Sequence, residues 1–347
     1  MKPKATVESV AKLAKVSPAT VSRIVNRTSR VRPEVEKRVR AAAADLGFDL
    51  HRKRRTKLIA FLLGNRPLLH PFHSQVLVAS EAYCAAADYS LLFFPLHYNP
   101  DHDWTRLHVP PILRRSDLID GFIVAGANHQ NLLELLSHIG LPFTILGDTV
   151  EGDWNPQNHD VMWVDDTNGA FEATTYLQSL GHKRIAYVAN VRKAWFARRL
   201  QGYNRAMEQA SLAPLVASID SEDEHQVGFL ATKRILAEGN GPVEAIFAGS
   251  DATCHGVYRA LREAGLSIPG DISVCGFNDT PEALVLYPPL TSVRVFPEII
   301  GRLLGEMVLA RIANTDLPPQ NQTIPTQLVK RESCLTRSES SNGKAAH

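Results

Sequence analysis

Short apolar runs recur along most of this chain and constrain its fold more than any other feature. Each run is apolar at nearly every position, which predicts a strand buried on both faces, as in parallel sheets with crossover helices. Helix-length segments separate the runs, at about 72–88, 103–115 and 130–139. The first four runs are residues 58–63, 91–94, 121–126 and 143–146.

The same alternation then begins again, with helix-length segments between the runs. These five runs are residues 161–164, 184–188, 215–219, 244–249 and 272–277. The repetition predicts two doubly wound α/β lobes with a crevice between them, where ligands bind beyond the carboxyl ends of the strands. The segment that follows, with a strand from about 289, a helix to about 313 and a strand from about 323, is expected to cross back and join the two lobes.

The first 50 residues have a different, helical period. Thr6 and Ser17 can cap two short helices that meet at a tight corner, and Pro18 suits the first position of the second helix. A third helix is predicted over Pro33–Leu46, where Gly47 would end it. Val35, Val39, Ala42, Ala43 and Leu46 would form its buried stripe, as Leu13 would within the first helix. Three helices in this length predict a small helix-turn-helix head.

Charge divides the chain in the same way. Residues 1–57 hold 16 Lys/Arg and 5 Asp/Glu, whereas the remainder holds 22 and 31. The outward residues of the second helix are small or hydrogen-bonding and end in Arg23, which suits a helix that enters a DNA major groove. The head is therefore expected to bind a polyanion, double-stranded DNA. The rest of the chain is not expected to bind one.

The composition limits the classes of protein to which the chain can belong. The length of 347 residues suits two or three domains, and no run of about 18 apolar residues predicts a membrane span. The four cysteines are scattered without a CxxC pair, and the basic N-terminus lacks the apolar stretch of a signal peptide. We therefore expect a cytoplasmic protein with reduced thiols and no metal site.

An enzyme is the less favoured class. No G-x-G-x-x-G motif follows a strand, and no Ser-His-Asp order with a nucleophile elbow is present. The sequence therefore predicts no cofactor and no catalytic residue. A sugar-binding transport receptor would share the two lobes, but the basic head and the missing signal peptide argue against it.

Several long segments resemble the LacI/GalR family of bacterial transcription regulators, in the family's order and over about residues 5–335. The resemblance implies a homodimer whose heads bind a pseudo-palindromic operator, and a repressor whose large domain, folded like a periplasmic sugar-binding protein, holds a small effector. A carbohydrate is the expected effector, with a nucleobase or another metabolite as the alternative. The matching segments are residues 6–26, 30–48, 165–190, 199–207, 247–279, 288–293 and 324–333.

The resemblance also assigns residues to DNA. Pro18, Ala19 and Arg23 fall where the family's recognition helix meets bases, and Thr20, Ser22 and Asn26 where it meets phosphates or bases. The other DNA-binding candidates are polar or basic residues of the head and of the connector after it. They are Thr6, Ser17, Arg27, Arg30, Arg52, Lys53, Arg54 and Arg55.

Six residues are candidates for contact with the effector. A polyol needs carboxylates to accept and an Arg fork to donate hydrogen bonds, and an aromatic face to pack on its C–H groups. The resemblance points to Phe72 and His73 after the first strand, Asp148 after the fourth, and Arg199 and Asp251 in the second lobe, with Trp195 as a stacking platform. The structural alternatives are a helix cap for Asp251, a lobe-stabilising ion pair for Arg199 and a core position for Trp195.

Two departures from the family pattern stand out. Lys15 occupies a turn position where Gly is common, and would be strained there by roughly 1 kcal/mol if φ is positive. The connector at 51–57 is basic and lacks the family's hinge helix with its minor-groove Leu wedge. We therefore hypothesise that the operator is bound without a sharp central kink. A circular-permutation gel shift that detects such a kink would refute this hypothesis.

These features divide the chain into a helix-turn-helix head (1–50), a basic linker (51–57), a two-lobed effector-binding and dimerisation domain (58–337) and a disordered tail (338–347). Two segments of the first lobe, 92–115 and 148–160, are rich in His, Asn, Asp and Trp. Their histidines lack metal-ligand spacing, so both are predicted to be solvated loops.

Overall fold

The computed structural model describes residues 6–26, 31–46, 56–66, 71–238 and 241–337. The chain forms two compact units, residues 1–58 with 110–120, and residues 59–109 with 121–347. The predicted tail at 338–347 and most of the predicted linker lie outside the described residues. At the end of that linker, the backbone N–H groups of Thr56 and Lys57 donate to the carboxylate of Asp120, at 3.1 and 3.0 Å.

The head contains the three predicted helices, α1 (Val7–Ala14), α2 (Pro18–Asn26) and α3 (Pro33–Leu46). Thr6 caps α1 through a capping box with Ser9, and the Ser17 hydroxyl accepts from the Thr20 N–H at 3.2 Å. Their apolar faces meet in one small core. It consists of Val10, Ala11, Ala14, Val21, Val39, Ala42 and Ala43.

Two residues expected on the buried faces of the head are exposed instead. The exposed fraction is 49% for Leu13 and 39% for Leu46. Three short helices enclose little volume, and small residues such as Ala42 and Ala43 already fill it. The helical period was therefore predicted correctly, but the width of the buried stripe was overestimated.

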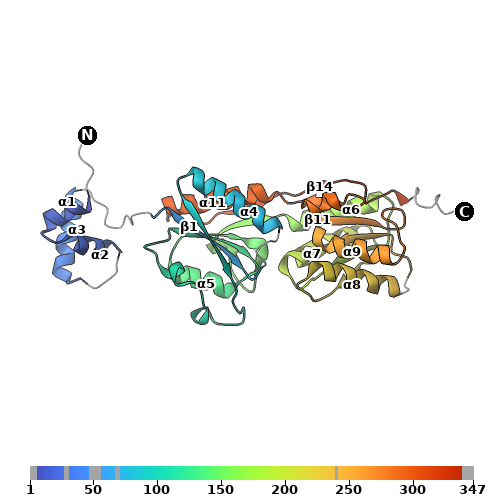
Figure 1. Ribbon diagram of the computed structural model, residues 1–347, viewed down its shortest axis with the longest axis horizontal. Coiled ribbons are helices and arrows are strands. Elements are labelled where there is room, and N and C mark those ends of the chain that lie inside the picture. The colour runs from blue at the N-terminus through green and yellow to red at the C-terminus, as the bar shows by residue number, and fades with distance from the viewer. Residues whose placement is uncertain (1–5, 27–30, 47–55, 67–70, 239–240, 338–347) are drawn as a thin grey trace, which may run out of the picture. The chain divides into compact units, whose positions relative to one another are not determined.

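The first lobe is built on a six-stranded sheet in the order β13-β7-β5-β3-β1-β2. Helices α4 (Pro71–Ala86) and α11 (Pro297–Ala313) lie along one face, and α5 (Gln130–Ile139) lies on the other (Figure 1). Strands β1, β3, β5 and β7 pair in parallel, as the apolar runs predicted. The strands are β1 (Leu58–Gly64), β2 (Ser90–Leu96), β3 (Gly121–Gly126), β5 (Phe143–Leu146), β7 (Asp160–Val164) and β13 (Asn321–Ile324), and a separate pair is β4 (Asn128–His129) with β6 (Val150–Glu151).

The second lobe repeats this plan in the order β14-β12-β11-β10-β8-β9, with β14 antiparallel at one edge. Four helices cover it and pack in pairs, α6 with α7 and α8 with α9. The strands are β8 (Ile185–Ala189), β9 (Leu215–Ser218), β10 (Ala245–Ala248), β11 (Ser273–Asn278), β12 (Thr291–Arg294) and β14 (Gln327–Val329). The helices are α6 (Asp166–Ser179), α7 (Ala194–Gln209), α8 (Glu224–Ala237), α9 (Asp251–Glu263) and the short α10 (Glu282–Val285).

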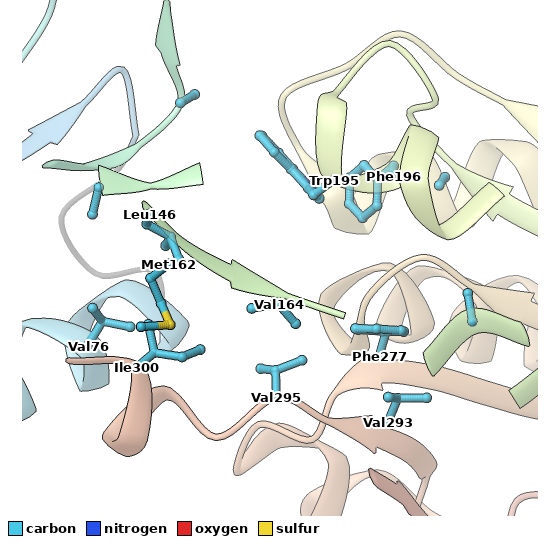
Figure 2. Close-up of a cluster of buried hydrophobic side chains, with 14 of the residues drawn as sticks. Val76, Leu146, Met162, Val164, Trp195, Phe196, Phe277, Val293, Val295 and Ile300 are labelled. Atoms are coloured by element: carbon cyan, nitrogen blue, oxygen red, sulfur yellow. The ribbon is translucent and has the colours of Figure 1, made fainter. Parts of the chain in front are cut away.

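Within the described residues, the chain passes between the two sheets three times, after β7, after β12 and after β13. The last segment therefore joins the lobes, as predicted. The Asp165 N–H donates to the Ile324 carbonyl at 2.9 Å and ties the first crossing to the third. Figure 2 shows side chains of both lobes in one hydrophobic cluster beside these crossings, including Leu146, Val295 and Phe277.

The helix expected over about 103–115 is wrong. The chain forms two separate 3₁₀ turns, Trp104–Arg106 and Pro111–Arg114. Pro110 and Pro111 supply no backbone N–H and disfavour helical conformation in the residue before them, so a continuous helix cannot form here. Among the described residues, no helix is long and apolar enough to cross a membrane.

Lys15 ends α1 in the left-handed conformation, with φ at 53°. Its Cβ is crowded there, so Lys15→Gly is expected to raise the free energy of unfolding of the head by about 1 kcal/mol. Hydrogen exchange of the α1–α3 amides in the full chain measures this change. Lys15→Ala, which removes the charge and keeps the Cβ, is the control, and an equal gain from this substitution would contradict the explanation.

Candidate functional site

A cavity lies between the two lobes, next to the crossings, with a volume of about 40 Å³. Ligand sites are typically ~300–1,000 Å³, so the space holds only a few water molecules and must widen to admit an effector. Figure 2 labels five of its apolar lining residues, Leu146, Val164, Trp195, Phe196 and Val295. The other lining residues are Arg66, Phe72, His73, Asp148, Thr149, Asp166, Arg199, Glu224, Ser250 and Asn278.

Five of the six predicted effector residues line this cavity, although they come from three places in the chain. Phe72 and His73 begin α4, with their rings edge to face at 5.1 Å. Asp148 follows β5, as expected for the carboxyl end of a strand. Trp195 and Arg199 lie four residues apart on α7, so helical geometry places both on the same face.

Arg199 is held by three separate parts of the second lobe. Its Nε donates to Asp166 at 2.8 Å, Nη1 to the Gly249 carbonyl at 2.6 Å and Nη2 to Asn278 at 3.2 Å. The guanidinium also lies 3.8 Å from the centre of the Phe277 ring. Arg199 therefore forms the ion pair that stabilises the second lobe and also lines the cavity. Two of its five N–H groups remain for a ligand.

A second buried ion pair joins the lobes across the cavity. Arg66, after β1, approaches Glu224 of α8 at 3.3 Å, and their side chains are only 8% and 9% exposed. The Ser250 hydroxyl donates to the other oxygen of Glu224 at 2.6 Å, and the Arg66 guanidinium stacks over the Trp195 ring at 4.4 Å. The Nε–H of Arg66 is buried and has no acceptor. Such a donor costs free energy until an acceptor reaches it.

Asp148 is buried beside a third arginine. Its Oδ2 accepts from the Val164 N–H at 2.5 Å, its backbone carbonyl accepts from Arg198, and Arg198 also lies 3.5 Å from both Asp148 and Asp166. Burial and then the negative charge of Asp166 raise the pKa of Asp148, while Arg198 acts to lower it. Asp148 therefore carries less negative charge near pH 7 than an ordinary aspartate.

Asp251, the sixth predicted effector residue, is not among the residues that line this cavity. It is fully buried at the start of α9, where Ser250 rather than Asp251 is the cap. The Ser292 hydroxyl donates to Oδ1 at 2.5 Å, and the N–H and hydroxyl of Thr280 donate to Oδ2 at 2.7 and 3.0 Å. Burial raises the pKa of Asp251 to about 7, against the lowering effect of these hydrogen bonds.

Six polar lining residues were not predicted from the sequence: Arg66, Thr149, Asp166, Glu224, Ser250 and Asn278. Five of them carried a usable signal, because they end a predicted strand or follow it within three residues: Arg66 after β1, Thr149 after β5, Asp166 after β7, Ser250 after β10 and Asn278 in β11. Glu224 carried none, since it lies at the start of a helix and reaches the cavity only through the packing of α8.

The DNA-binding candidates of the head occupy the exposed side of its helix pair. Thr6, Ser17, Pro18, Ala19, Ser22 and Arg23 are exposed, and Thr20 is half-buried. The Ser17 and Thr20 hydroxyls lie 2.9 Å apart and hydrogen-bond to each other. Arg27, Arg30, Arg52, Lys53, Arg54 and Arg55 lie outside the described residues, as does the side chain of Asn26.

Comparison with known proteins agrees with both parts of the chain. Residues 6–49 match the family model "Bacterial regulatory proteins, lacI family", and residues 174–334 match a "Periplasmic binding protein-like domain". The chain is 30% identical to the ribose operon repressor of Escherichia coli K12, over 95% of this chain and 99% of that one. The chain belongs to the LacI family.

Other LacI-family relatives extend over a similar length. The repressor PurR of Histophilus somni is 29% identical over 96% of this chain and 99% of its own. The solved complex of the regulator CelR with cellobiose is 26% identical, with a TM-score of 0.71 over 95% of this chain and 99% of that one. A regulator from Enterococcus faecalis with bound ribose is 26% identical, with a TM-score of 0.67 over 80% and 99%.

This LacI-family chain is thus a DNA-binding repressor controlled by a small effector, with a helix-turn-helix head and two α/β lobes. The family consists of transcription regulators and not of enzymes.

The bonding of Asp251 predicts a structural effect. Asp251→Asn keeps an acceptor for the Thr280 N–H but turns an NH₂ group toward the Ser292 hydroxyl, which now donates to the carboxylate, so it should lower the free energy of unfolding by about 1–3 kcal/mol. Urea unfolding at neutral pH measures the loss. Asp220→Asn, which changes an exposed carboxylate of the same lobe, is the control. Unchanged stability with lost effector binding would restore Asp251 as an effector contact.

Proposed function

We propose that the effector of this repressor is a neutral carbohydrate that binds between the lobes. The observation that carries the proposal is the Nε–H of Arg66, a residue that lines the cavity beside Glu224; this N–H is buried and lacks an acceptor. A sugar hydroxyl can accept from this N–H and donate to a carboxylate at the same time. Trp195, Phe72 and Phe196 offer aromatic faces for the C–H groups of the ring.

The pairing of the arginines around the cavity favours a neutral ligand over an anionic one. Each of the three arginines around the cavity lies against a carboxylate: Arg66 against Glu224, Arg199 against Asp166, and Arg198 against Asp148 and Asp166. A neutral sugar would let these pairs form again around it, whereas a phosphorylated sugar would compete with the carboxylates for their arginines. The ribose operon repressor and the cellobiose complex of CelR, both similar to this chain, agree with a sugar. A nucleobase is the second candidate.

In this proposal, effector binding acts on the ion pairs that close the cavity. The lobes must separate to admit a sugar, which pulls Arg66 away from Glu224 and Arg198 away from Asp148. The bound sugar then stabilises a different degree of lobe closure, and this change alters the spacing of the two heads of a homodimer on a pseudo-palindromic operator. The repressor works in the cytoplasm, without catalysis.

Arg66→Lys tests the effector site. It keeps a positive charge near Glu224 but removes the Nε–H, so affinity for the sugar should fall about tenfold. A thermal-shift screen of the full chain with ribose, cellobiose, adenine and guanine finds the ligand, and calorimetry gives its affinity. Arg192→Lys, in an exposed ion pair of the second lobe, is the control. Stabilisation by a purine base alone, or unchanged affinity in Arg66→Lys, would refute the proposal.

Within the head, we propose that the exposed residues of α2 read the operator. Arg23→Ala should weaken binding to the operator by about 1–3 kcal/mol and reduce its discrimination from unrelated DNA. Fluorescence anisotropy with a footprinted site from the gene's own upstream region measures both effects. Arg38→Ala, an exposed arginine of α3, is the control. If Arg23→Ala leaves discrimination intact, α2 is not the reading helix in the manner proposed.

A further inference from the structure

The two loops of the first lobe that are rich in His, Asn, Asp and Trp converge on one groove. Trp104 comes from the first loop and Trp154 from the second, and the outer face of α5 completes the lining. The groove has a volume of about 440 Å³, within the range of small-molecule sites. It is lined by Trp104, Gln130, Leu133, Glu134, Ser137, His138, Asp153, Trp154, Asn155 and His159.

Helix α5 contributes a polar surface with helical spacing. Gln130, Glu134 and His138 are four residues apart, and Ser137 lies beside them, so all four share the outer face while Leu133 is buried. The Gln130 amide donates to Glu134 at 2.7 Å. The side of the groove formed by α5 therefore offers a carboxylate, an amide and a hydroxyl.

Trp104 is held in place by its own loop. Asp103 accepts from the N–H and hydroxyl of Thr105, at 2.9 and 2.6 Å, and so fixes the turn that carries Trp104. The Trp104 ring lies 4.5 Å from the His138 ring of α5. The amide of Asn131 also donates to three carbonyls of the preceding loop, which ties that loop to the same helix.

Trp154 is held in place by β7, the strand that follows its loop. Its ring stacks on Trp163 of β7, with centres 5.9 Å apart and planes 26° apart, and Trp163 donates to Asn321 at 3.2 Å. His159 lies 6.0 Å from the same ring, and burial lowers its pKa, which keeps it neutral near pH 7. Both tryptophans are thus positioned before any ligand arrives, which reduces the entropy lost on binding.

The lining chemistry selects among ligands. Glu134 and Asp153 carry negative charge, and the groove lining contains no Lys or Arg, so phosphates and nucleic acid are excluded. An alkylammonium ion would suit the rings and carboxylates, but it has no acceptor for the donors of Gln130, Ser137 and Asn155. A saccharide supplies hydroxyls that donate and accept, and C–H faces that pack on aromatic rings.

We propose that this groove is a second binding site, for a neutral saccharide, on the first lobe and separate from the interlobe cavity. None of its lining residues lines that cavity. The site therefore does not depend on the identity of the effector, and it can be occupied while the cavity is closed.

The four tryptophans of the chain allow each site to be observed separately. Trp195 reports on the interlobe cavity, whereas Trp104 and Trp154 report on the groove. The full chain is labelled with 5-fluorotryptophan, its ¹⁹F signals are assigned by single Trp→Phe variants, and it is titrated with glucose and cellobiose. We expect the Trp104 and Trp154 signals to shift together, with millimolar affinity typical of a site with few contacts, and with a curve different from that of Trp195.

Glu134→Gln tests the polar side of the groove. It should weaken the response of Trp104 and Trp154 about fivefold or more, and leave the Trp195 titration unchanged. The proposal is overturned if neither saccharide moves the two signals up to about 50 mM, if choline moves them and saccharides do not, or if Glu134→Gln has no effect. Failure of the interlobe effector site would appear only at Trp195, so the two outcomes are distinguishable.

Discussion

The two-lobed unit depends on arginines that are buried against carboxylates where its segments meet. Arg199 joins the start of α6 to the ends of β10 and β11, through Asp166, Gly249 and Asn278. Arg198, the next residue, reaches across to Asp148 of the first lobe. Removing one partner would leave a charge buried without compensation, which typically costs ~3–5 kcal/mol. The geometry of the cavity is therefore tied to the pairing of these charges.

The same pairing explains how a cavity of about 40 Å³ can serve as a regulatory site. Ion pairs such as Arg66 with Glu224 hold the lobes together but leave the Arg66 Nε–H without an acceptor. A closed state with an unmet hydrogen bond differs from a ligand-bound state by a modest free energy. A sugar that supplies the missing acceptor can shift the equilibrium between these two states. The three crossings are the segments through which one lobe moves relative to the other.

Much of the architecture was predictable because its signals are local. Thr6 and Ser17 cap helices where their side chains meet the next backbone N–H groups, and continuous apolar runs became parallel strands. The site was predictable only in part. Phe72, His73, Asp148, Trp195 and Arg199 line the cavity, whereas Asp251 follows a strand in the same way and points into the second lobe, where Ser292 and Thr280 surround it.

The sequence by itself determined the helix-turn-helix head, the two α/β lobes and the strand ends near which ligand-binding residues had to lie, because capping and periodicity depend on neighbouring residues. Only the tertiary structure decided which polar residues meet. Arg66 and Glu224 are 158 positions apart, and Asp251 and Ser292 are 41 apart. Helix packing and the register of parallel strands bring such pairs together, and no local pattern records them. The groove between Trp104 and Trp154 arose in the same way, from two loops that looked merely solvated when each was considered alone.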